Sequence, residues 1–187
     1  MANRNTQGFG LIPAGTLGQT PATSGTGKYK IDAGYTTTIY HGGAVASNAG
    51  YIIDGQTTDA PILGVLNGIF YNAATTLKPT FANFYKQPIT PANSEDVDAF
   101  VYDNPQQQYV VATDDSVAQS GYLETYDMNT SAGSDITGKS SATLDIGDTS
   151  ADAASFRLLR SAEDPENDEN AAFRSVVVVA NLIELQS

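Results

Sequence analysis

Short runs of apolar and β-branched residues, separated by turn residues, fill most of the chain after residue 28. Gly-Gly, Asp-Gly and Asp-Asn-Pro sequences stand between the runs and supply the positive φ angles or local hydrogen bonds of tight turns. Short strands at this spacing are typical of an all-β fold, either an antiparallel barrel or a sandwich. The predicted strands span residues 29–31, 36–40, 51–53, 62–71, 80–85, 97–102 and 108–112.

The last third of the chain contains two further predicted strands. One spans residues 156–159, and the other lies in the nearly continuous apolar run of residues 176–185, which includes four consecutive valines. Because β-branched side chains pack well on a pleated sheet, such a run favours a strand that is buried on both faces. We therefore expect the end of the chain to be part of the core.

Two segments depart from the strand pattern. Between residues 116 and 126 the apolar positions are spaced closer to a helical period, which predicts one short helix. Residues 127–154 are rich in Ser, Thr, Gly and Asp and predict an irregular excursion over the surface.

The first 27 residues are rich in Gly, Ser and Thr and contain a short apolar patch at Phe9, Leu11 and Ile12. We predict an extended N-terminal arm over residues 1–27, followed by a single β domain over residues 28–187. An arm that cannot bury its own apolar residues commonly lies on another protein, so Arg4, Phe9, Leu11 and Ile12 are the predicted partner-binding residues. The alternative is a disordered tail.

The net charge of −12 is unevenly distributed. Residues 1–93 carry +2 and residues 94–187 carry −14. An acidic protein repels nucleic acid and anionic lipid, and no apolar run has the length of a membrane span, so neither is an expected partner. The 187 residues include no cysteine, which excludes disulfides and thiolate metal sites.

The sequence gives little support to catalysis. His41 is the only histidine, it precedes a Gly-Gly turn, and no G-x-S-x-G nucleophile motif is present. Residues 25–28 resemble a phosphate loop only in part, because Ala22 stands where the first glycine is needed and Tyr29 where Ser or Thr is needed. We therefore predict a protein that is not an enzyme and has no cofactor.

The acidic run of residues 163–170 is the best candidate for binding a hard cation such as calcium. It lacks the oxygen spacing and central glycine of an EF-hand loop, and a solvated acidic loop is the simpler interpretation. No metal-ligating residue is predicted.

Several segments, in the same order, resemble capsid decoration proteins of short-tailed and other tailed phages. Residues 62–71, ILGVLNGIFY, are similar to the family's I-L-G-V-F-x-G-x-x-Y and are the most specific match. Gly10 departs from the family's usual Arg, and residues 41–44 replace a tighter Gly-Asp-Pro turn. The other similar segments are residues 8–13, 29–35, 39–45, 79–85, 99–105, 109–114, 137–140, 156–167 and 176–181.

This resemblance implies a structural virion protein, made in the host cytoplasm, that binds the capsid exterior and stabilises contacts between major capsid protein subunits. Copies of the chain itself on the capsid surface are further candidate partners. The alternative is a virion adhesion module that binds host-surface glycan through exposed tyrosines. A virion enzyme, which would need His41 or a pair of carboxylates, is a third hypothesis.

Overall fold

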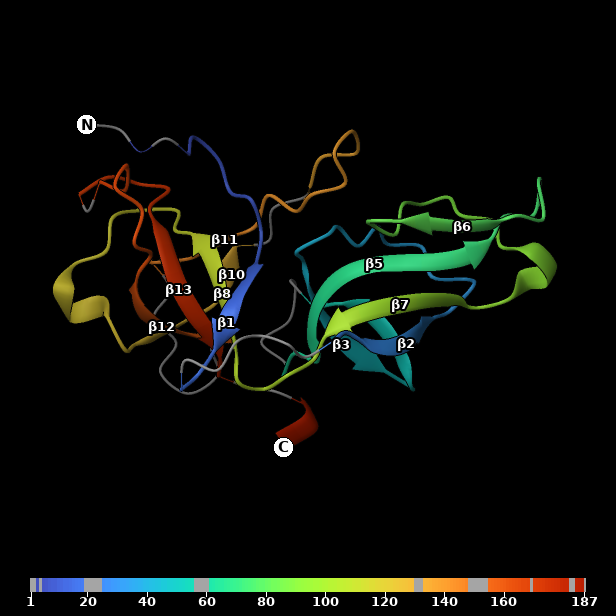
Figure 1. Cartoon of the computed structure of the whole chain (residues 1–187), viewed down its shortest axis with the longest axis horizontal. Helices are drawn as coiled ribbons and strands as arrows, with labels where there is room; N and C mark the ends of the chain where they lie inside the picture. The colour runs from blue at the N-terminus through green and yellow to red at the C-terminus, as the bar shows by residue number, and fades with distance from the viewer. Residues whose placement is uncertain are drawn as a thin grey trace.

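The computed structural model describes residues 3, 5–18, 25–55, 61–129, 133–147, 155–168, 170–181 and 184–186. Over these residues the protein is all-β and its sheets are antiparallel, which confirms the predicted fold class. Figure 1 shows two lobes lying side by side, each built around one large sheet. No helix in the described part of the chain is long and apolar enough to cross a membrane.

The five-stranded lobe has the strand order β1-β8-β13-β12-β9, and a two-stranded sheet of β10 and β11 packs into the same core (Figure 1). Its buried cluster is centred on Tyr109, Phe156 and Leu158. The strands are β1 (Ile12–Thr16), β8 (Gln107–Ala112), β9 (Thr125–Tyr126), β10 (Met128–Asn129), β11 (Thr143–Leu144), β12 (Phe156–Ser161) and β13 (Ser175–Ala180).

The six-stranded lobe has the order β2-β7-β5-β3-β4, and β6 pairs with the second half of β5. The strands at the two ends of this order, β2 and β4, lie close together. No ladder joins them in the described residues, so the sheet curls without closing into a barrel. The strands are β2 (Gly27–Ile31), β3 (Ala44–Asn48), β4 (Tyr51–Asp54), β5 (Gly64–Asn72), β6 (Pro79–Ala82) and β7 (Val97–Tyr102).

The valine-rich strand β13 lies between β8 and β12 in the five-stranded sheet. Each of its four valines, Val176, Val177, Val178 and Val179, is buried. The predicted buried strand is therefore confirmed for residues 176–179, whereas β13 ends at Ala180 and Leu185, at the end of the predicted run, is 54% exposed. Beyond it, the backbone N–H of Glu184 donates to the carbonyl of Ile62 in the other lobe.

The first strand corrects the expectation of a separate N-terminal arm. β1 pairs with β8 at the edge of the five-stranded sheet, and Leu11, immediately before it, is only 1% exposed. Pro13 is tolerated there because an edge strand needs no donor on its outer side. The chain therefore begins in the five-stranded lobe, builds the six-stranded lobe with β2 to β7, and returns with β8.

The predicted short helix is also wrong. Over residues 116–126 the chain forms only a single 3-10 turn, Gln119–Gly121, and then enters β9. Val117 and Tyr126 are buried in the same core, and the Tyr126 hydroxyl donates to the Gly121 carbonyl at 3.0 Å. These tertiary contacts override the local periodicity, which was never long enough to nucleate a stable helix.

Other boundaries shift in smaller ways. Strand β3 had no separate prediction, and the expected strand at residues 36–40 is reduced to one bridge between Ile39 and Tyr85. The excursion at residues 127–154 contains the hairpin-like pair β10 and β11, and its residues 130–132 and 148–154 lie outside the described residues.

Candidate partner-binding surface

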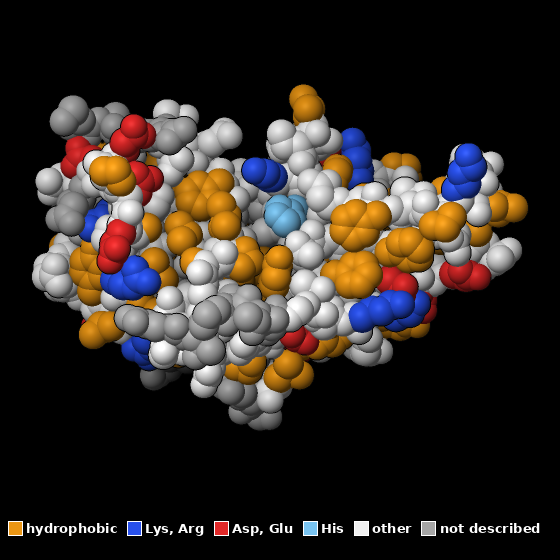
Figure 2. Space-filling view, viewed as in Figure 1, with side chains coloured by type: hydrophobic (Ala, Val, Ile, Leu, Met, Phe, Trp, Pro, Cys, Tyr) orange, Lys and Arg blue, Asp and Glu red, His pale blue; other side chains and the backbone are white. Residues whose placement is uncertain are grey.

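Three phenylalanines lie on the outer face of the six-stranded sheet, over β5, β6 and β7. In β7 the side chains of Val97, Ala99 and Val101 are buried, so the alternate residue Phe100 faces outward. The register places Phe100 opposite Gly68, and places Phe70 opposite Phe81 of β6, so all of these residues share one face. We call Phe70, Phe81 and Phe100 the aromatic face. Figure 2 shows hydrophobic side chains gathered over this lobe.

The Phe81 and Phe100 rings come together because Gly68, which lies between them, has no side chain. A Cβ at Gly68 would lie 2.8 Å from the Phe81 ring, so the glycine allows that ring to lean across β5. The Phe81 and Phe100 ring centroids are 6.1 Å apart at an interplanar angle of 39°, a favourable tilted geometry. Phe81 nevertheless remains 63% exposed. One exposed ring flanked by two partly buried ones is an apolar patch of the kind found at interaction surfaces.

Charged side chains border the aromatic face on the β2 side. Lys28 lies opposite Phe100 in the register, and Lys30 lies opposite Asp98. The Lys28 and Lys30 ammonium groups reach the two Asp98 oxygens at 2.7 and 2.6 Å. Burial alone would raise the pKa of Asp98, but hydrogen bonds and attraction from both lysines outweigh it and hold that pKa below its ordinary value. The Asp98 hydrogen bond is also the largest cause that raises the pKa of Lys30.

This ion-pair cluster makes a prediction for stability. Since the pKa of Asp98 is lower in the folded protein than in the unfolded chain, its contribution is present above its ordinary value of 3.8 and is lost as the pH falls through the folded pKa. Asp98→Asn should reduce the free energy of unfolding by about 1 kcal/mol or less at pH 7, because both lysines are half exposed. Urea denaturation of both proteins between pH 7 and pH 3 checks this. A deficit that stays constant across the range would contradict it.

The two lobes meet where several of the motif segments come together. The backbone N–H of Leu11 donates to the Gly42 carbonyl at 2.8 Å, and the N–H of Gly42 donates to Leu66 at 2.9 Å. The N–H of Gly10 donates to Ala142 at 3.2 Å. These bonds join four segments that are far apart in the sequence, and three of them (residues 8–13, 39–45 and 62–71) are motif segments, so these motifs help to hold the lobes together.

His41 lies at the centre of this junction, and it is the pale blue side chain in Figure 2. Its backbone N–H donates to Gly138, its carbonyl accepts from Ser140, and its Nδ1–H donates to the Asn67 carbonyl at 2.8 Å. One ring nitrogen is thus bound to the backbone rather than to a carboxylate or a nucleophile. The arrangement supports a structural role for His41 and offers nothing to the enzyme hypothesis.

The loop of residues 133–142 crosses from the five-stranded lobe to the other one. The Asp135 carboxylate accepts a hydrogen bond from the Tyr40 hydroxyl at 2.8 Å and pairs with Lys86 at 3.4 Å. The Tyr40 hydrogen bond is the largest cause that lowers the pKa of Asp135. The Tyr40 ring stacks on Phe84 with centroids 5.8 Å apart. The loop is therefore docked on the six-stranded lobe by side chains as well as by backbone.

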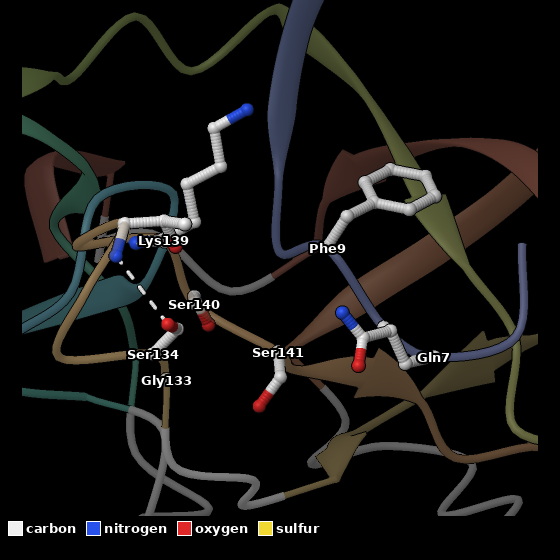
Figure 3. Close-up of a pocket in the computed structure, with 9 residues that line it drawn as sticks. Gln7, Phe9, Gly133, Ser134, Lys139, Ser140 and Ser141 are labelled. Carbon is white, nitrogen blue, oxygen red and sulfur yellow. Dashed lines mark hydrogen bonds between the residues drawn. The ribbon is translucent and has the colours of Figure 1, made fainter.

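A pocket of about 310 Å³ opens between this loop and the N-terminal segment. Figure 3 shows the side chains of Phe9 and Lys139 rising from two sides of it. The Ser134 hydroxyl accepts the Thr137 N–H, and the Thr137 hydroxyl accepts the Lys139 N–H, so neither hydroxyl uses its own proton in these bonds. The pocket can therefore donate hydrogen bonds to a small polar or anionic group. It is lined by Gln7, Gly8, Phe9, Gly133, Ser134, Thr137, Lys139, Ser140 and Ser141.

The predicted partner-binding residues do not lie together on one surface. Phe9 is half-buried and lines the pocket, Leu11 is in the core, and Ile12 is 50% exposed on β1. Arg4 lies outside the described residues. The Leu11 side chain is therefore occupied by the protein's own core, which leaves Phe9 and Ile12 as the members of this set that a partner can reach.

The acidic run at residues 163–170 makes backbone and amide contacts rather than a cluster of carboxylates. The Asn3 side chain donates to the carbonyls of Ala171 and Ala172, and the Asn167 amide donates to the Ser175 carbonyl at 2.8 Å. Among the described residues, no group of three or more His, Asp or Glu side chains is placed to hold a metal ion. Residue 169 is not among them.

Sequence reasoning missed the aromatic face for a specific reason. The alternation of β7 did contain a signal, because Phe100 shares its face with Asp98 rather than with the buried valines. In β5, however, the register shifts between Leu66 and Gly68, and this irregularity changes which side chains face outward. A period of two read along the sequence cannot place Phe70 beyond such a shift.

No family model matches the chain, and no curated protein or solved structure was found to match it. The resemblance of its motifs to phage decoration proteins thus stays a prediction.

Proposed function

We propose that this chain is a structural, non-enzymatic virion protein that binds the exterior of a tailed-phage capsid and stabilises contacts between major capsid protein subunits. The proposal combines the ordered motif resemblance with one structural observation. The aromatic face exposes Phe81 and presents Phe70 and Phe100 beside it, on a sheet whose opposite side is the lobe's own core. A protein that binds only the assembled shell stabilises it by mass action.

The glycan-binding alternative has less support from the side chains. The hypothesis relies on exposed tyrosines, but the hydroxyls of Tyr29, Tyr40 and Tyr51 each donate their proton to a carboxylate of the protein itself. Burial, followed by the hydrogen bond and charge of Asp103, raises the pKa of Tyr29 to about 12. The exposed ring of the aromatic face is a phenylalanine, Phe81, which offers no hydrogen bond to a sugar.

The direct test is sedimentation of the purified protein with empty mature capsids of the phage that encodes it. We expect the protein to pellet with the shells at a fixed ratio to the major capsid protein and to stay in the supernatant without them. Capsids decorated to saturation should also withstand a higher temperature before they open. Failure to pellet at any protein concentration, together with binding to a glycan array, would replace this function by the adhesion module.

A further inference from the structure

The pocket between the N-terminal segment and the loop of residues 133–142 is a local positive site. Among the described residues that line it, only Lys139 is charged. The Lys139 ammonium forms no ion pair with any residue that the structure describes. The one carboxylate of the loop, that of Asp135, does not line the pocket and is held by Tyr40 and Lys86. On a chain of net charge −12, the pocket therefore attracts an anionic group that the rest of the protein repels.

Uncharged hydrogen-bonding groups make up most of the remaining lining. The hydroxyls of Ser134 and Thr137 each accept a backbone N–H at 3.3 Å and can donate their own proton to a ligand. The Gln7 amide lies beside Phe9 in Figure 3 and offers both a donor and an acceptor. A simple carboxylate bound to Lys139 would leave these groups unused. The lining therefore favours a ligand that carries hydroxyl groups as well as a negative charge.

The Phe9 ring and the size of the pocket restrict the ligand further. Phe9 supplies an apolar wall across the pocket from Lys139 (Figure 3), and its flat face suits the C–H face of a sugar ring. The volume of about 310 Å³ is at the lower end for ligand pockets, so there is room for one ring-sized ligand. A single ammonium balances the single charge of a carboxylate, whereas a phosphate would bring additional negative charge.

The walls of the pocket are held in place by the fold itself. Gly8 has no side chain, which lets the N-terminal segment pack directly on the loop, since a Cβ there would collide with the Ser141 carbonyl oxygen. The loop is fixed from the six-stranded lobe, where the Asn83 side chain donates to the Thr137 carbonyl at 2.9 Å. A pocket that is already formed loses little conformational entropy when a ligand binds.

From these features we propose that the pocket binds a hexuronic acid, a sugar that carries one carboxylate. The Lys139 ammonium meets the carboxylate, and the Phe9 ring covers the apolar face of the sugar. The hydroxyls of Ser134 and Thr137 and the Gln7 amide bind the sugar hydroxyls. This site is separate from the aromatic face and from the tyrosines of the glycan hypothesis. It adds a second binding activity to the proposed capsid function and does not depend on it.

Titration of the purified protein with methyl glucuronide, followed by calorimetry and by NMR of the backbone amides, tests this site. We expect a dissociation constant of about 1 mM or tighter, as a ligand of this size reaches. The largest chemical-shift changes should fall on residues 7–9 and 133–141. Methyl glucoside, which lacks the carboxylate, and sodium acetate, which lacks the ring, should each bind at least ~10-fold more weakly.

Three variants test the roles of the side chains. Lys139→Gln removes the cation, and Lys78→Gln is the matched control, since Lys78 is an exposed lysine that does not line the pocket. The Lys139 variant should bind methyl glucuronide at least ~10-fold more weakly and lose most of the salt dependence of binding, whereas the Lys78 variant should bind within about twofold of the unchanged protein. Phe9→Leu keeps an apolar side chain but removes the flat ring, and should weaken binding about threefold. Circular dichroism confirms that each variant is folded.

The outcomes that would overturn the site are distinct from failure of the capsid function. If the amides of the pocket do not respond to methyl glucuronide well above its expected dissociation constant, or if Lys139→Gln binds it as tightly as the unchanged protein, the site is wrong. If sodium acetate or sodium phosphate binds as tightly as methyl glucuronide, the pocket takes small anions in general and the sugar is overturned. These measurements need no capsids, so failure of the protein to pellet with capsids overturns the proposed function and leaves this site standing.

Discussion

Leu11→Ala is expected to lower the free energy of unfolding by about 3 kcal/mol, within the range measured for buried leucines. The Leu11 side chain is 1% exposed and belongs to a cluster that also contains Val65 of the six-stranded lobe and Tyr109 of the five-stranded lobe. Truncating it therefore leaves a cavity where the two lobes share a core. Urea denaturation followed by circular dichroism measures the change.

The neighbouring residue provides the control. Ile12 is 50% exposed on edge strand β1, so Ile12→Ala should cost less than about 1 kcal/mol. If the two variants were equally stable, Leu11 would not be part of the core, and the N-terminal segment would again qualify as an arm. This pair therefore distinguishes a strand of the fold from a segment that lies on a partner.

Gly8→Ala should have an effect of similar size for a different reason. A Cβ at Gly8 would lie 2.0 Å from the Ser141 carbonyl oxygen, which belongs to the backbone and cannot move aside without shifting the loop of residues 133–142. We expect a loss of more than about 2 kcal/mol, typical of overpacking against backbone. Thermal denaturation should show a clearly lower midpoint.

Gly15 in β1 is the matched control for this substitution. A Cβ at Gly15 would meet nothing within 4 Å, so Gly15→Ala should change stability by less than about 0.5 kcal/mol. Equal effects at the two glycines would mean that the N-terminal segment does not pack on the loop. The pocket beside Phe9, which these two segments enclose, would then not exist in the form described.

The motif segments have a structural explanation that is independent of the capsid proposal. Residues 8–13, 39–45, 62–71 and 137–140 all contribute backbone hydrogen bonds to the junction between the lobes. Gly10, Gly42 and Gly138 make backbone hydrogen bonds at this junction, and the His41 ring donates to the Asn67 carbonyl beside them. Phe70, Phe81 and Phe100 lie in the similar segments 62–71, 79–85 and 99–105, but only the pairing of β5 with β6 and β7 brings them to one face.

Local pattern was sufficient for the all-β class, for most strands and for the burial of β13. Residues 97–102 could be predicted as a strand from their alternation of apolar and polar residues. The four valines could be predicted as a buried strand from their continuous apolar run.

Tertiary structure decided the features that depend on distant residues. Leu11 looked like part of an arm because β1 is short and interrupted by Pro13 and Gly15, and only its pairing with β8 makes it a strand. The aromatic face depends on the register shift in β5 and on the space above Gly68. Neither the pairing of β1 nor the aromatic face can be predicted from a short stretch of sequence, because a β-sheet is stabilised by pairing and packing between segments that are far apart in the sequence.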